Sequence, residues 1–290
     1  MIDIEPDFAK TKVASVVVLF NPSEGAVESI LSYSHQVGDI FVIDNSENVN
    51  IIVVNKIRSI QNVVYVGLDK NMGVAHALNH GARMAIEGKY EFLLTMDQDT
   101  SLPPEYVKEM INRMRQQTEL VGIASAKHFQ KKASKSLQLN RVLFTMTSAN
   151  LVNLRAYQCI GPFRDDLFID YVDCEFCLRL NKMGFRVLEF NKTSIVHNLG
   201  ELIEKKILFY HFKFRSHSPF RLYYIFRNGL LVSATYSKDF PKIRLVIFSV
   251  LFKELLKALL LEDKKFVRLK FILDGCVDYL NRRLGKYADS

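Results

Sequence analysis

Residues 90–99 read YEFLLTMDQD, and an apolar run ends there in Asp97-Gln98-Asp99. The run Tyr90–Met96 is apolar enough to predict a buried strand. On extended backbone, alternate side chains share one face, so Asp97 and Asp99 would point the same way. Two carboxylates on one side suit Mg²⁺ or Mn²⁺, which also take oxygens from a diphosphate. The other interpretation is a polar turn in which Asp99 caps the next helix.

Strands and helices alternate along the first half of the chain. Apolar runs rich in β-branched residues predict strands, and apolar residues three or four apart predict helices. The predicted order is strand 12–20, helix 24–36, strand 39–43, strand 62–66, helix 73–87, strand 90–96 and a helix opened by Pro103-Pro104. This alternation is typical of βαβ units, so we expect an α/β fold with a mainly parallel sheet and flanking helices.

The second half of the chain is less regular. It predicts a strand or strand pair over 141–151, a turn over 161–163, a helix over 173–183 and a short strand over 186–190. From Phe209 onward the chain is aromatic, basic and mostly helical. We therefore expect an α/β domain over residues 1–228, followed by a basic, amphipathic helical region over residues 229–290.

Polar side chains follow the predicted strands at the points where these strands end. The clusters are Asn21, Asp44-Asn45-Ser46, Asn71-Met72-Gly73 and Asp97-Gln98-Asp99. Ligands of open parallel sheets bind beyond the carboxyl ends of the strands. The agreement of the four clusters predicts one binding site at that edge of the sheet.

Two of these clusters have the chemistry to hold a nucleotide. A carboxylate at Asp44, with Asn45 beside it, can accept the N3–H of a uracil or thymine ring, although an Asx turn is the other interpretation. Asn71 and Gly73 open a helix, and a helix N-terminus favours a phosphate. The same segment, N-x-G-x-x-x-A-x-N-x-G over residues 71–81, could instead serve close helix packing by small residues.

A second acidic cluster, DYVDCEFCLR, occupies residues 170–179. A carboxylate at the start of the predicted helix, Asp173, can act as a general base toward an acceptor hydroxyl. Arg179 follows Glu175 by four residues and can pair with it. A helix cap with a surface ion pair is the alternative interpretation.

Three further residues are candidates for holding a diphosphate or its counter-ion. His197 follows the last short strand, although a lone histidine is usually structural. Arg221 and Arg227 lie in residues 205–237, which contain six basic residues and no acidic one. Such cations can bind a diphosphate, or they can simply begin the basic C-terminal region.

Charge is unevenly distributed along the 290 residues, whose net charge is +8. Residues 205–290 contain 18 Lys+Arg and 7 Asp+Glu, whereas residues 1–204 contain 21 and 24. A basic half indicates an anionic partner: a membrane, a nucleic acid or a substrate. Four cysteines are too few for a disulfide scaffold, and Cys174 and Cys177 are expected on one helix face. The acidic N-terminus, Met1–Asp7, predicts no secretory signal and a cytosolic location.

Residues 243–261, IRLVIFSVLFKELLKALLL, are nearly apolar enough to span a bilayer, but charged residues interrupt them. Lys253, Glu254 and Lys257 share one face, which fits a helix lying in the membrane interface. Seven cations can meet anionic lipid: Lys264, Lys265, Arg268, Lys270, Arg282, Arg283 and Lys286. We predict peripheral attachment to the cytoplasmic face of the inner membrane. A helical subdomain packed on the α/β domain, or a homodimer interface, is the other interpretation.

The order of these motifs resembles the GT-A fold of family 2 glycosyltransferases: N-P after the first strand, D-N-S after the second, N-x-G-x-x-x-A-x-N-x-G, and D-Q-D. Three further segments resemble the bacterial rhamnosyltransferase branch of that family, which uses dTDP-L-rhamnose. They are residues 170–179, His197 with the following Asn-Leu-Gly200, and HSPFRLYYIFRN over 217–228. The match runs from about Val13 to Asn228. It is more specific for the superfamily than for the sugar.

The resemblance implies a role for each site residue. Asp44 contacts the base, Asp97 lies near the ribose and diphosphate, and Asp99 is the main ligand of Mg²⁺ or Mn²⁺. Asp173 matches the catalytic aspartate of the family's E-D-x-D-x-x-x-R element. Glu175 and Arg179 match it too, whereas Val172 stands where many members have Glu. His197 is a metal or diphosphate ligand, as in related galactofuranosyltransferases.

The implied reaction is an inverting sugar transfer from dTDP-L-rhamnose to a glycan or a polyprenyl-diphosphate-linked acceptor, as in O-antigen or capsule synthesis. Three alternatives stay open. A galactofuranosyl- or other hexosyltransferase would use a UDP-sugar. A nucleotidyltransferase should have a basic loop after the first strand, where residues 21–24 read NPSE. A non-enzymatic binder of anionic polymers would not need the acidic clusters, so we expect no nucleic acid partner.

Overall fold

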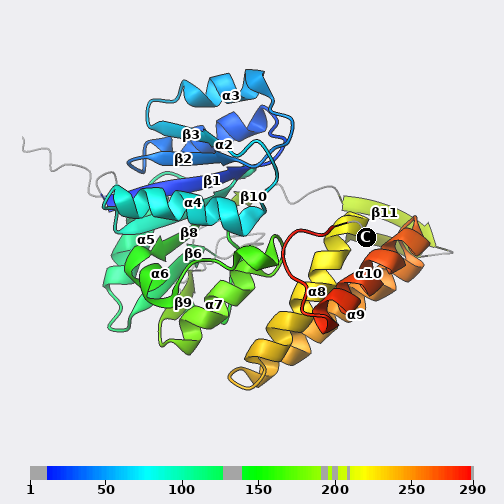
Figure 1. Cartoon of the computed structure of the whole chain (residues 1–290). Coiled ribbons are helices and arrows are strands. Elements are labelled where there is room, and N and C mark those ends of the chain that lie inside the picture. Colours follow the sequence, from blue (N-terminus) through cyan, green and yellow to red (C-terminus); the bar gives the residue numbers. More distant parts are fainter. Residues whose placement is uncertain (1–11, 127–138, 191–194, 198–201, 208–209, 289–290) are drawn as a thin grey trace, which may run out of the picture. The chain divides into compact units, whose positions relative to one another are not determined.

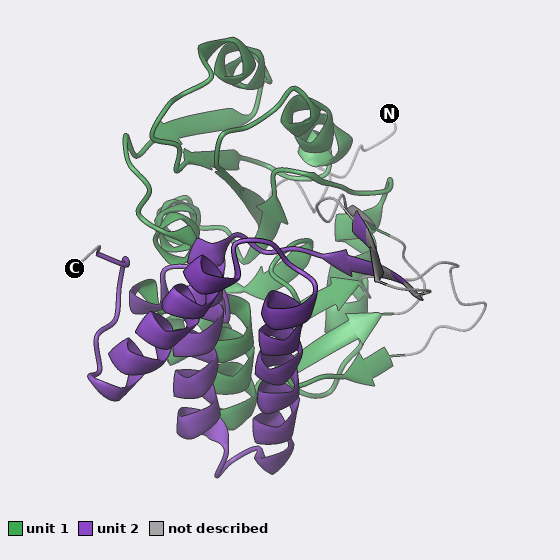
Figure 2. Cartoon of the chain, turned by 90° about the vertical axis from the view of Figure 1, so that its right-hand side faces the viewer, with its two compact units in different colours: residues 1–165, 173–198 green, residues 166–172, 199–290 purple. Residues whose placement is uncertain are grey.

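The computed structural model describes residues 12–126, 139–190, 195–197, 202–207 and 210–288. The chain forms two compact units (Figures 1 and 2): unit 1 is Met1–Asp165 with Asp173–Asn198, and unit 2 is Asp166–Val172 with Leu199–Ser290. The acidic N-terminal segment and residues 198–200, which entered the sequence predictions, lie outside the described residues. The expected boundary at residue 228 is displaced, because helix α8 (Pro219–Tyr236) runs through it without a break.

Unit 1 is built on an eight-stranded sheet in the order β3-β2-β1-β4-β8-β6-β9-β7. Strands β8 and β7 run antiparallel to their neighbours, and the other pairs are parallel. The strands are β1 (Val13–Leu19), β2 (Ile40–Asp44), β3 (Val63–Gly67), β4 (Phe92–Asp97), β6 (Val121–Ala126), β7 (Leu139–Arg141), β8 (Asn150–Asn153) and β9 (Arg186–Phe190). The predicted α/β fold with a mainly parallel sheet is confirmed.

Helices pack on both faces of this sheet, because the central strands are apolar on both sides. Val13, Val17 and Leu19 of β1 share a buried cluster with residues of α2 and α5. Val16 points to the opposite face, where a Cβ on Gly81 of α4 would lie 2.2 Å from its Cγ2 atom. The helices of unit 1 are α2 (Gly25–Ser34), α3 (Ile51–Arg58), α4 (Val74–Glu87), α5 (Tyr106–Arg115), α6 (Leu154–Ile160) and α7 (Val172–Lys182), which begins on the last residue assigned to unit 2.

Strand β6 and helices α3 and α6 are among the elements of unit 1 that were not predicted. Strand β6 reads VGIASA and is buried throughout, so it lacks the alternation that marks a half-exposed strand. Helix α3 carries the exposed apolar residues Ile51 and Ile52, so the helical spacing of its buried residues is hard to recognise in the sequence. Helix α6 is only seven residues long. Each is recognisable mainly through its tertiary contacts.

The described part of unit 2 combines a hairpin with three α-helices. Strands β11 (Leu202–Ile207) and β12 (Tyr210–Arg215) pair antiparallel, and this hairpin was not predicted. Helix α8 packs against both α9 (Pro241–Leu260) and α10 (Lys265–Leu280). A Cβ on Gly275 of α10 would lie 2.5 Å from the carbonyl oxygen of Tyr223, so α10 and α8 approach through their backbones. Among the described helices, none is long and apolar enough to cross a bilayer.

Candidate active site

The carboxyl ends of β1, β2 and β4 meet because these strands are parallel neighbours. In the paired registers, Leu19 lies beside Asp44 of β2 and Val18 lies beside Asp97 of β4. Asp44 and Asp97 therefore flank the last residues of β1. The prediction that polar strand ends gather at one edge of the sheet is confirmed for these strands.

Side chains tie the loop after β1 to its two neighbours. The backbone N–H of Asn21 donates to Oγ of Ser46 at 2.7 Å. On the other side, Oε1 of Gln98 accepts from the backbone N–H of Phe20 at 2.8 Å, and its Nε2 donates to the carbonyl of Phe20 at 3.2 Å. Gln98 thus hydrogen-bonds both the backbone N–H and the backbone carbonyl of Phe20 in the neighbouring loop. This role was not predicted, because no nearby residue indicates that the glutamine between the two aspartates bonds a distant loop.

A similar clasp joins the end of β2 to the start of α4. Asn45 donates from Nδ2 to Oδ1 of Asn71 at 3.0 Å, and its Oδ1 accepts from the N–H of Met72 at 2.7 Å. Gly73 is the N-cap of α4 and has φ +89°, a conformation that favours glycine. Asn45 and Asn71 therefore hydrogen-bond the end of β2 to the segment that precedes α4, beside the N-terminus of that helix. Phosphate binding at Gly73 stays a prediction.

Asp44 is buried, with 1% of its surface exposed. Its Oδ1 accepts from the backbone N–H of Ser46 at 2.9 Å, which is the Asx turn that the sequence allowed. Its Oδ2 accepts from the hydroxyl of Tyr65 at 2.8 Å. Burial, followed by this bond to Asp44, raises the pKa of Tyr65, so the phenol stays a neutral donor. The contact between Asp44 and a base stays a prediction.

The geometry of Asp97-Gln98-Asp99 differs from the expected one. Strand β4 ends at Asp97, and Gln98 and Asp99 form a turn into the short strand β5 (Thr100–Ser101). The expectation that both carboxylates point one way because the backbone is extended is therefore wrong. Ser148 braces the turn: its Oγ accepts from the N–H of Asp97 at 3.1 Å and donates to Oγ1 of Thr100 at 2.8 Å.

His197 is brought beside this acidic turn by strand pairing. It belongs to β10 (Val196–His197), which runs antiparallel to β5 with His197 opposite Thr100. About one hundred residues of sequence separate the two partners, and only the backbone of His197 is described. The short pairing places the backbone of His197 beside Thr100, and its role as a ligand stays a prediction.

The donor set of the turn fits a divalent ion. Within the described residues, no three His, Cys, Asp or Glu side chains group closely enough to hold a metal. Asp97 and Asp99 are nevertheless partly exposed on a single turn. Mg²⁺ is typically held by one or two carboxylates together with substrate phosphates. Metal binding by Asp99, Asp97 and His197 stays a prediction.

Asp173 lies in the first turn of α7 and is half-buried. Its Oδ1 accepts from the N–H of Cys174 at 2.7 Å. A small cavity separates this start of α7 from the sheet, and Asp173 lines it together with Thr95 of β4 and Asn150 of β8. Asn150 is 3% exposed, and none of the described residues donates a hydrogen bond to its Oδ1 atom. Asp173 is thus placed against polar groups of the central strands.

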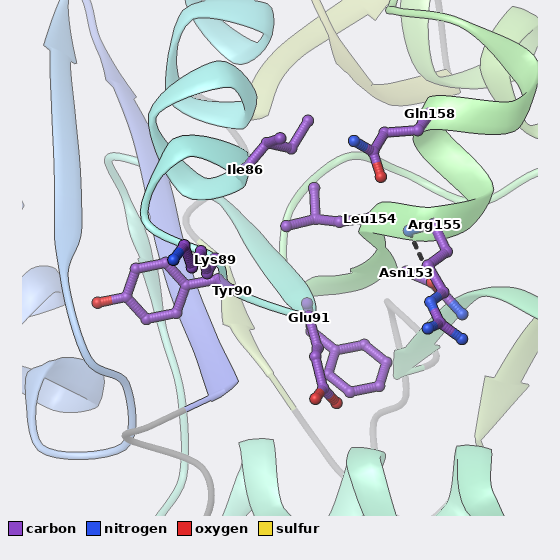
Figure 3. A pocket seen from close by; sticks show the side chains of 9 residues that line it. Ile86, Lys89, Tyr90, Glu91, Asn153, Leu154, Arg155 and Gln158 are labelled. Atoms are coloured by element: carbon purple, nitrogen blue, oxygen red, sulfur yellow. Dashed lines mark hydrogen bonds between the residues drawn. The ribbon is translucent and has the colours of Figure 1, made fainter.

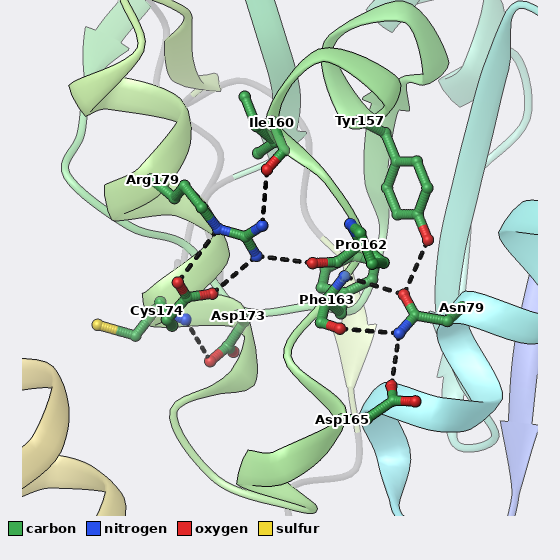
Figure 4. A network of polar contacts seen from close by, with 10 residues as sticks. Asn79, Tyr157, Ile160, Pro162, Phe163, Asp165, Asp173, Cys174 and Arg179 are labelled. Carbon is green, nitrogen blue, oxygen red and sulfur yellow. Dashed lines mark hydrogen bonds and ion pairs between the residues drawn. The ribbon is translucent and has the colours of Figure 1, made fainter.

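Arg179 and Glu175 form the predicted pair, and it is internal rather than on the surface. Glu175 is 2% exposed and accepts from Nε and Nη2 of Arg179 at 3.1 and 2.9 Å. The guanidinium also donates to the carbonyls of Ile160 and Pro162 at 2.8 and 2.7 Å (Figure 4). The pair therefore fastens the predicted turn at 161–163 to the helix that carries Asp173.

Asn79 of α4 holds the other side of this turn (Figure 4). Its Nδ2 donates to the carbonyl of Phe163 at 2.8 Å and to Oδ1 of Asp165 at 2.5 Å. Its Oδ1 accepts from the hydroxyl of Tyr157 and the N–H of Phe163 at 2.8 and 2.9 Å. With Gly81 packed on β1, the second half of the 71–81 motif serves packing, as the alternative interpretation held.

Arg227 does not support its predicted role as a diphosphate ligand. It is fully buried. All five of its guanidinium N–H donors have partners within unit 2: the carbonyls of Asp166, Leu167 and Gly285, the Tyr223 hydroxyl and Oδ1 of Asn228. No donor is left for a ligand, so Arg227 is corrected to a structural residue. Arg221 stays a candidate, because its half-exposed guanidinium pairs with Asp170 near the surface.

Residues 22–186 match the family "Glycosyl transferase family 2". The chain belongs to this family. It is 26% identical over 268 residues to "dTDP-rhamnosyl transferase RfbF" of Shigella flexneri, and the alignment covers 86% of this chain and 89% of that protein.

Solved structures of glycosyltransferases share the fold. Residues 1–349 of S. aureus TarS match with a TM-score of 0.57 at 15% identity, over 94% of this chain and 82% of that one. The TarS 1–349 complex with UDP-GlcNAc matches with a TM-score of 0.57 at 14% identity, over 94% and 81%. The fold is GT-A, as the sequence resemblance predicted.

Family membership sets the rival classes aside. A family 2 glycosyltransferase is a sugar-transferring enzyme, so neither a nucleotidyltransferase nor a non-enzymatic binder of anionic polymers accounts for the chain. The choice that remains is between nucleotide-sugar donors.

A second pocket of this glycosyltransferase lies at the other end of β4 (Figure 3). It is lined by residues around the start of that strand, including Lys89, Glu91 and Arg155. Ligands of open parallel sheets, such as a sugar donor here, bind at the carboxyl ends of the strands. This pocket is therefore distinct from the site that contains Asp97.

The C-x-x-C pair is a helix feature, as predicted. Cys174 and Cys177 are free thiols buried on α7. Burial raises the pKa of both thiols, which keeps them protonated and unreactive. They serve the packing of the helix that carries Asp173.

Proposed function

We propose that this enzyme transfers L-rhamnose from dTDP-L-rhamnose, with inversion, to a glycan or polyprenyl-diphosphate-linked acceptor in bacterial surface polysaccharide synthesis, such as O-antigen or capsule. The donor choice rests on the 26% identity to a protein named dTDP-rhamnosyl transferase across 86% of this chain. A lipid-linked acceptor is consistent with an enzyme that acts at the cytoplasmic face of the inner membrane.

Asp173 is the proposed general base. Its carboxylate takes the proton from an acceptor hydroxyl while the hydroxyl oxygen forms a bond to the anomeric carbon. The bond between that carbon and the diphosphate breaks on the opposite face, and dTDP leaves with the electron pair. Two observations support this role: Asp173 is half-buried in the first turn of α7, and the internal Glu175–Arg179 pair holds that helix against the neighbouring turn.

The donor is proposed to lie along the carboxyl ends of β1, β2 and β4. Asp44 would accept the N3–H of thymine, and Asp97 would lie near the ribose and diphosphate. The N-terminus of α4 at Gly73 would face a phosphate. A Mg²⁺ or Mn²⁺ ion held by Asp99, Asp97 and His197 would neutralise charge on the leaving diphosphate. The strand-end positions of these residues support the arrangement.

Thermal unfolding with different nucleotide sugars tests the donor. With Mg²⁺ or Mn²⁺ present, dTDP-rhamnose should raise the unfolding temperature more than UDP-galactofuranose or UDP-GlcNAc at the same concentration, because only a bound ligand stabilises the fold. Selective stabilisation by a UDP-sugar would replace the proposed donor with the alternative hexosyl or galactofuranosyl donor. That second donor class is kept because the TarS fold neighbour is described in complex with UDP-GlcNAc.

A further inference from the structure

Helix α9 exposes a stripe of apolar residues along its outer side and holds a charged pair on its inner side, where Ile243, Ile247 and Leu251 are also buried. Leu245, Phe248, Phe252 and Leu256 are spaced by three or four residues, so they form one stripe along the helix. All four are exposed, with 74% of Leu245 and 60% of Phe252 accessible. In contrast, Glu254 and Lys257 form an ion pair whose side chains are only 15% and 12% exposed.

The inward charges of α9 are fixed by contacts within unit 2. Nζ of Lys257 donates to Oε1 of Glu254 at 2.8 Å and to the backbone carbonyl of Arg215 at 2.9 Å. The sequence predicted that Lys253, Glu254 and Lys257 together form the wetted face of an interfacial helix. That expectation is wrong for Glu254 and Lys257, because both are used to dock α9 within its own unit.

Helix α10 has a stripe of its own. Phe266, Leu273, Val277 and Leu280 recur at helical spacing and are exposed, with Phe266 90% accessible. The opposite side is internal: Ile272 is buried, and Gly275 lies against the backbone of α8. Exposed apolar patches of this kind mark interaction sites in soluble proteins.

Charge is segregated around these stripes. Three acidic groups are buried or half-buried: Glu262 pairs with Arg268 at 2.8 Å, Asp274 accepts from Tyr287, and Asp278 accepts from Tyr223. Asp239 and Asp263 are exposed, but the exposed cations outnumber them: Lys242, Arg244, Lys253, Lys264, Lys265, Lys270, Arg282 and Arg283. Arg268 is corrected from the predicted lipid-facing set, since it is 9% exposed and paired. The outer surface of α9 and α10 is therefore both apolar and basic.

We propose that the outward faces of α9 and α10, defined by these two stripes and their cations, bind the surface of an anionic phospholipid bilayer. Apolar side chains would enter the boundary between headgroups and acyl chains, and the cations would meet lipid phosphates. A second copy of the chain would oppose like charges across this surface. A nucleic acid would leave the Leu and Phe stripes uncovered. The proposal does not depend on which sugar donor the enzyme uses.

Vesicle flotation tests the apolar part of the surface. The full chain should bind vesicles of phosphatidylglycerol mixed with phosphatidylethanolamine. The double variant Phe252→Ser/Leu256→Ser should bind them at least about tenfold more weakly, because two large apolar side chains lose their burial. The matched control is Ile51→Ser/Ile52→Ser on α3, whose side chains are 58% and 65% exposed in unit 1. This control should bind as the unmodified chain does.

Charge substitutions test the basic part. Lys264→Gln/Lys265→Gln should weaken binding to the same vesicles by roughly tenfold, since each cation near an anionic surface contributes separately. The control Lys89→Gln/Lys108→Gln in unit 1 should leave binding unchanged. Vesicles of phosphatidylcholine alone should bind the unmodified chain poorly. Thermal unfolding of every variant checks that it is folded.

Three results would overturn the proposal. One is the unmodified chain failing to float with anionic vesicles. In the second, the variant Phe252→Ser/Leu256→Ser is folded and binds vesicles as well as its control does. In the third, the same variant still binds vesicles, but the molecular mass of the protein in solution changes, which would assign the surface to a second copy of the chain.

Discussion

Asn228 in α8 donates from Nδ2 to the carbonyl oxygen of Asp170 at 3.0 Å, three residues before Asp173. The same amide donates to the carbonyls of Leu167 and Ile169 at 2.9 and 2.8 Å. The segment it holds is strained, because Phe168, Asp170 and Tyr171 have φ values of +66°, +60° and +64°. Such conformations cost about 1–3 kcal/mol each and persist where surrounding contacts enforce them. The conformation of residues 167–170, which precede α7 in the chain, therefore depends on α8.

Asn228→Ala should lower kcat by about tenfold or more, because a small misplacement of a reacting group is costly. Binding of dTDP, measured by calorimetry, should stay near normal. Thr235→Ala is the control, since this exposed threonine on the same helix donates to the carbonyl of Leu231 in its own turn. A loss of thermal stability with kcat intact would show that Asn228 supports the fold but does not position Asp173.

Asp173→Asn should lower kcat by roughly 10²–10⁴-fold, the usual contribution of general base catalysis. The amide keeps the shape of the side chain but cannot take the acceptor proton, so dTDP affinity should change little. Release of dTDP from dTDP-rhamnose in the presence of acceptor measures the effect. Glu87→Gln, an exposed carboxylate at the end of α4, is the control. Normal turnover in Asp173→Asn would remove Asp173 from the mechanism.

Asp99→Ala should abolish the part of dTDP affinity that depends on a divalent ion. Titration calorimetry with Mg²⁺ or Mn²⁺, and again with a chelator, separates that part from the rest. In the unmodified enzyme the chelator should weaken binding, whereas in Asp99→Ala it should make little difference. If the variant keeps its full metal-dependent affinity, the metal is held elsewhere.

Gly81→Ala should destabilise the fold by about 1–3 kcal/mol, the usual cost of overpacking a core. The added Cβ would meet Cγ2 of Val16 at 2.2 Å, so α4 must move off β1. Gly25→Ala is the matched control, because its Cβ would lie 3.6 Å from the nearest atom, Oγ of Ser23. Denaturant unfolding compares the two variants. Equal stabilities would mean that α4 adjusts without loss.

Local sequence pattern was sufficient for strands β1, β2, β3 and β4 and for their polar edge, but not for β6. Strands such as β1 and β2 are continuous apolar runs bounded by turn residues, so their positions follow from nearby residues alone. Parallel strands then bring Asp44 and Asp97 to one edge, whatever the rest of the chain does. The helix that carries Asp173, and the Glu175–Arg179 pair four residues apart on it, are local in the same sense.

Other features depend on partners distant in sequence. Gln98 grips Phe20 across 78 residues, and His197 is placed by pairing with Thr100. The turn at Gln98-Asp99 also breaks the extended geometry that a strand pattern assumes. No window of sequence contains both members of these contacts, so their roles could not be predicted from it.

The sequence by itself determined the family, the α/β sheet, the polar strand ends and the basic C-terminal half. Only the tertiary structure decided which charged groups of that half are internal. Arg227 looked like a diphosphate ligand, but partners up to 61 residues away use all its donors. Glu254 and Lys257 looked solvated, but they dock α9 from the inside and leave its Leu and Phe stripe exposed. The physical reason is that helical spacing fixes which residues share a face, whereas only packing fixes which face is buried.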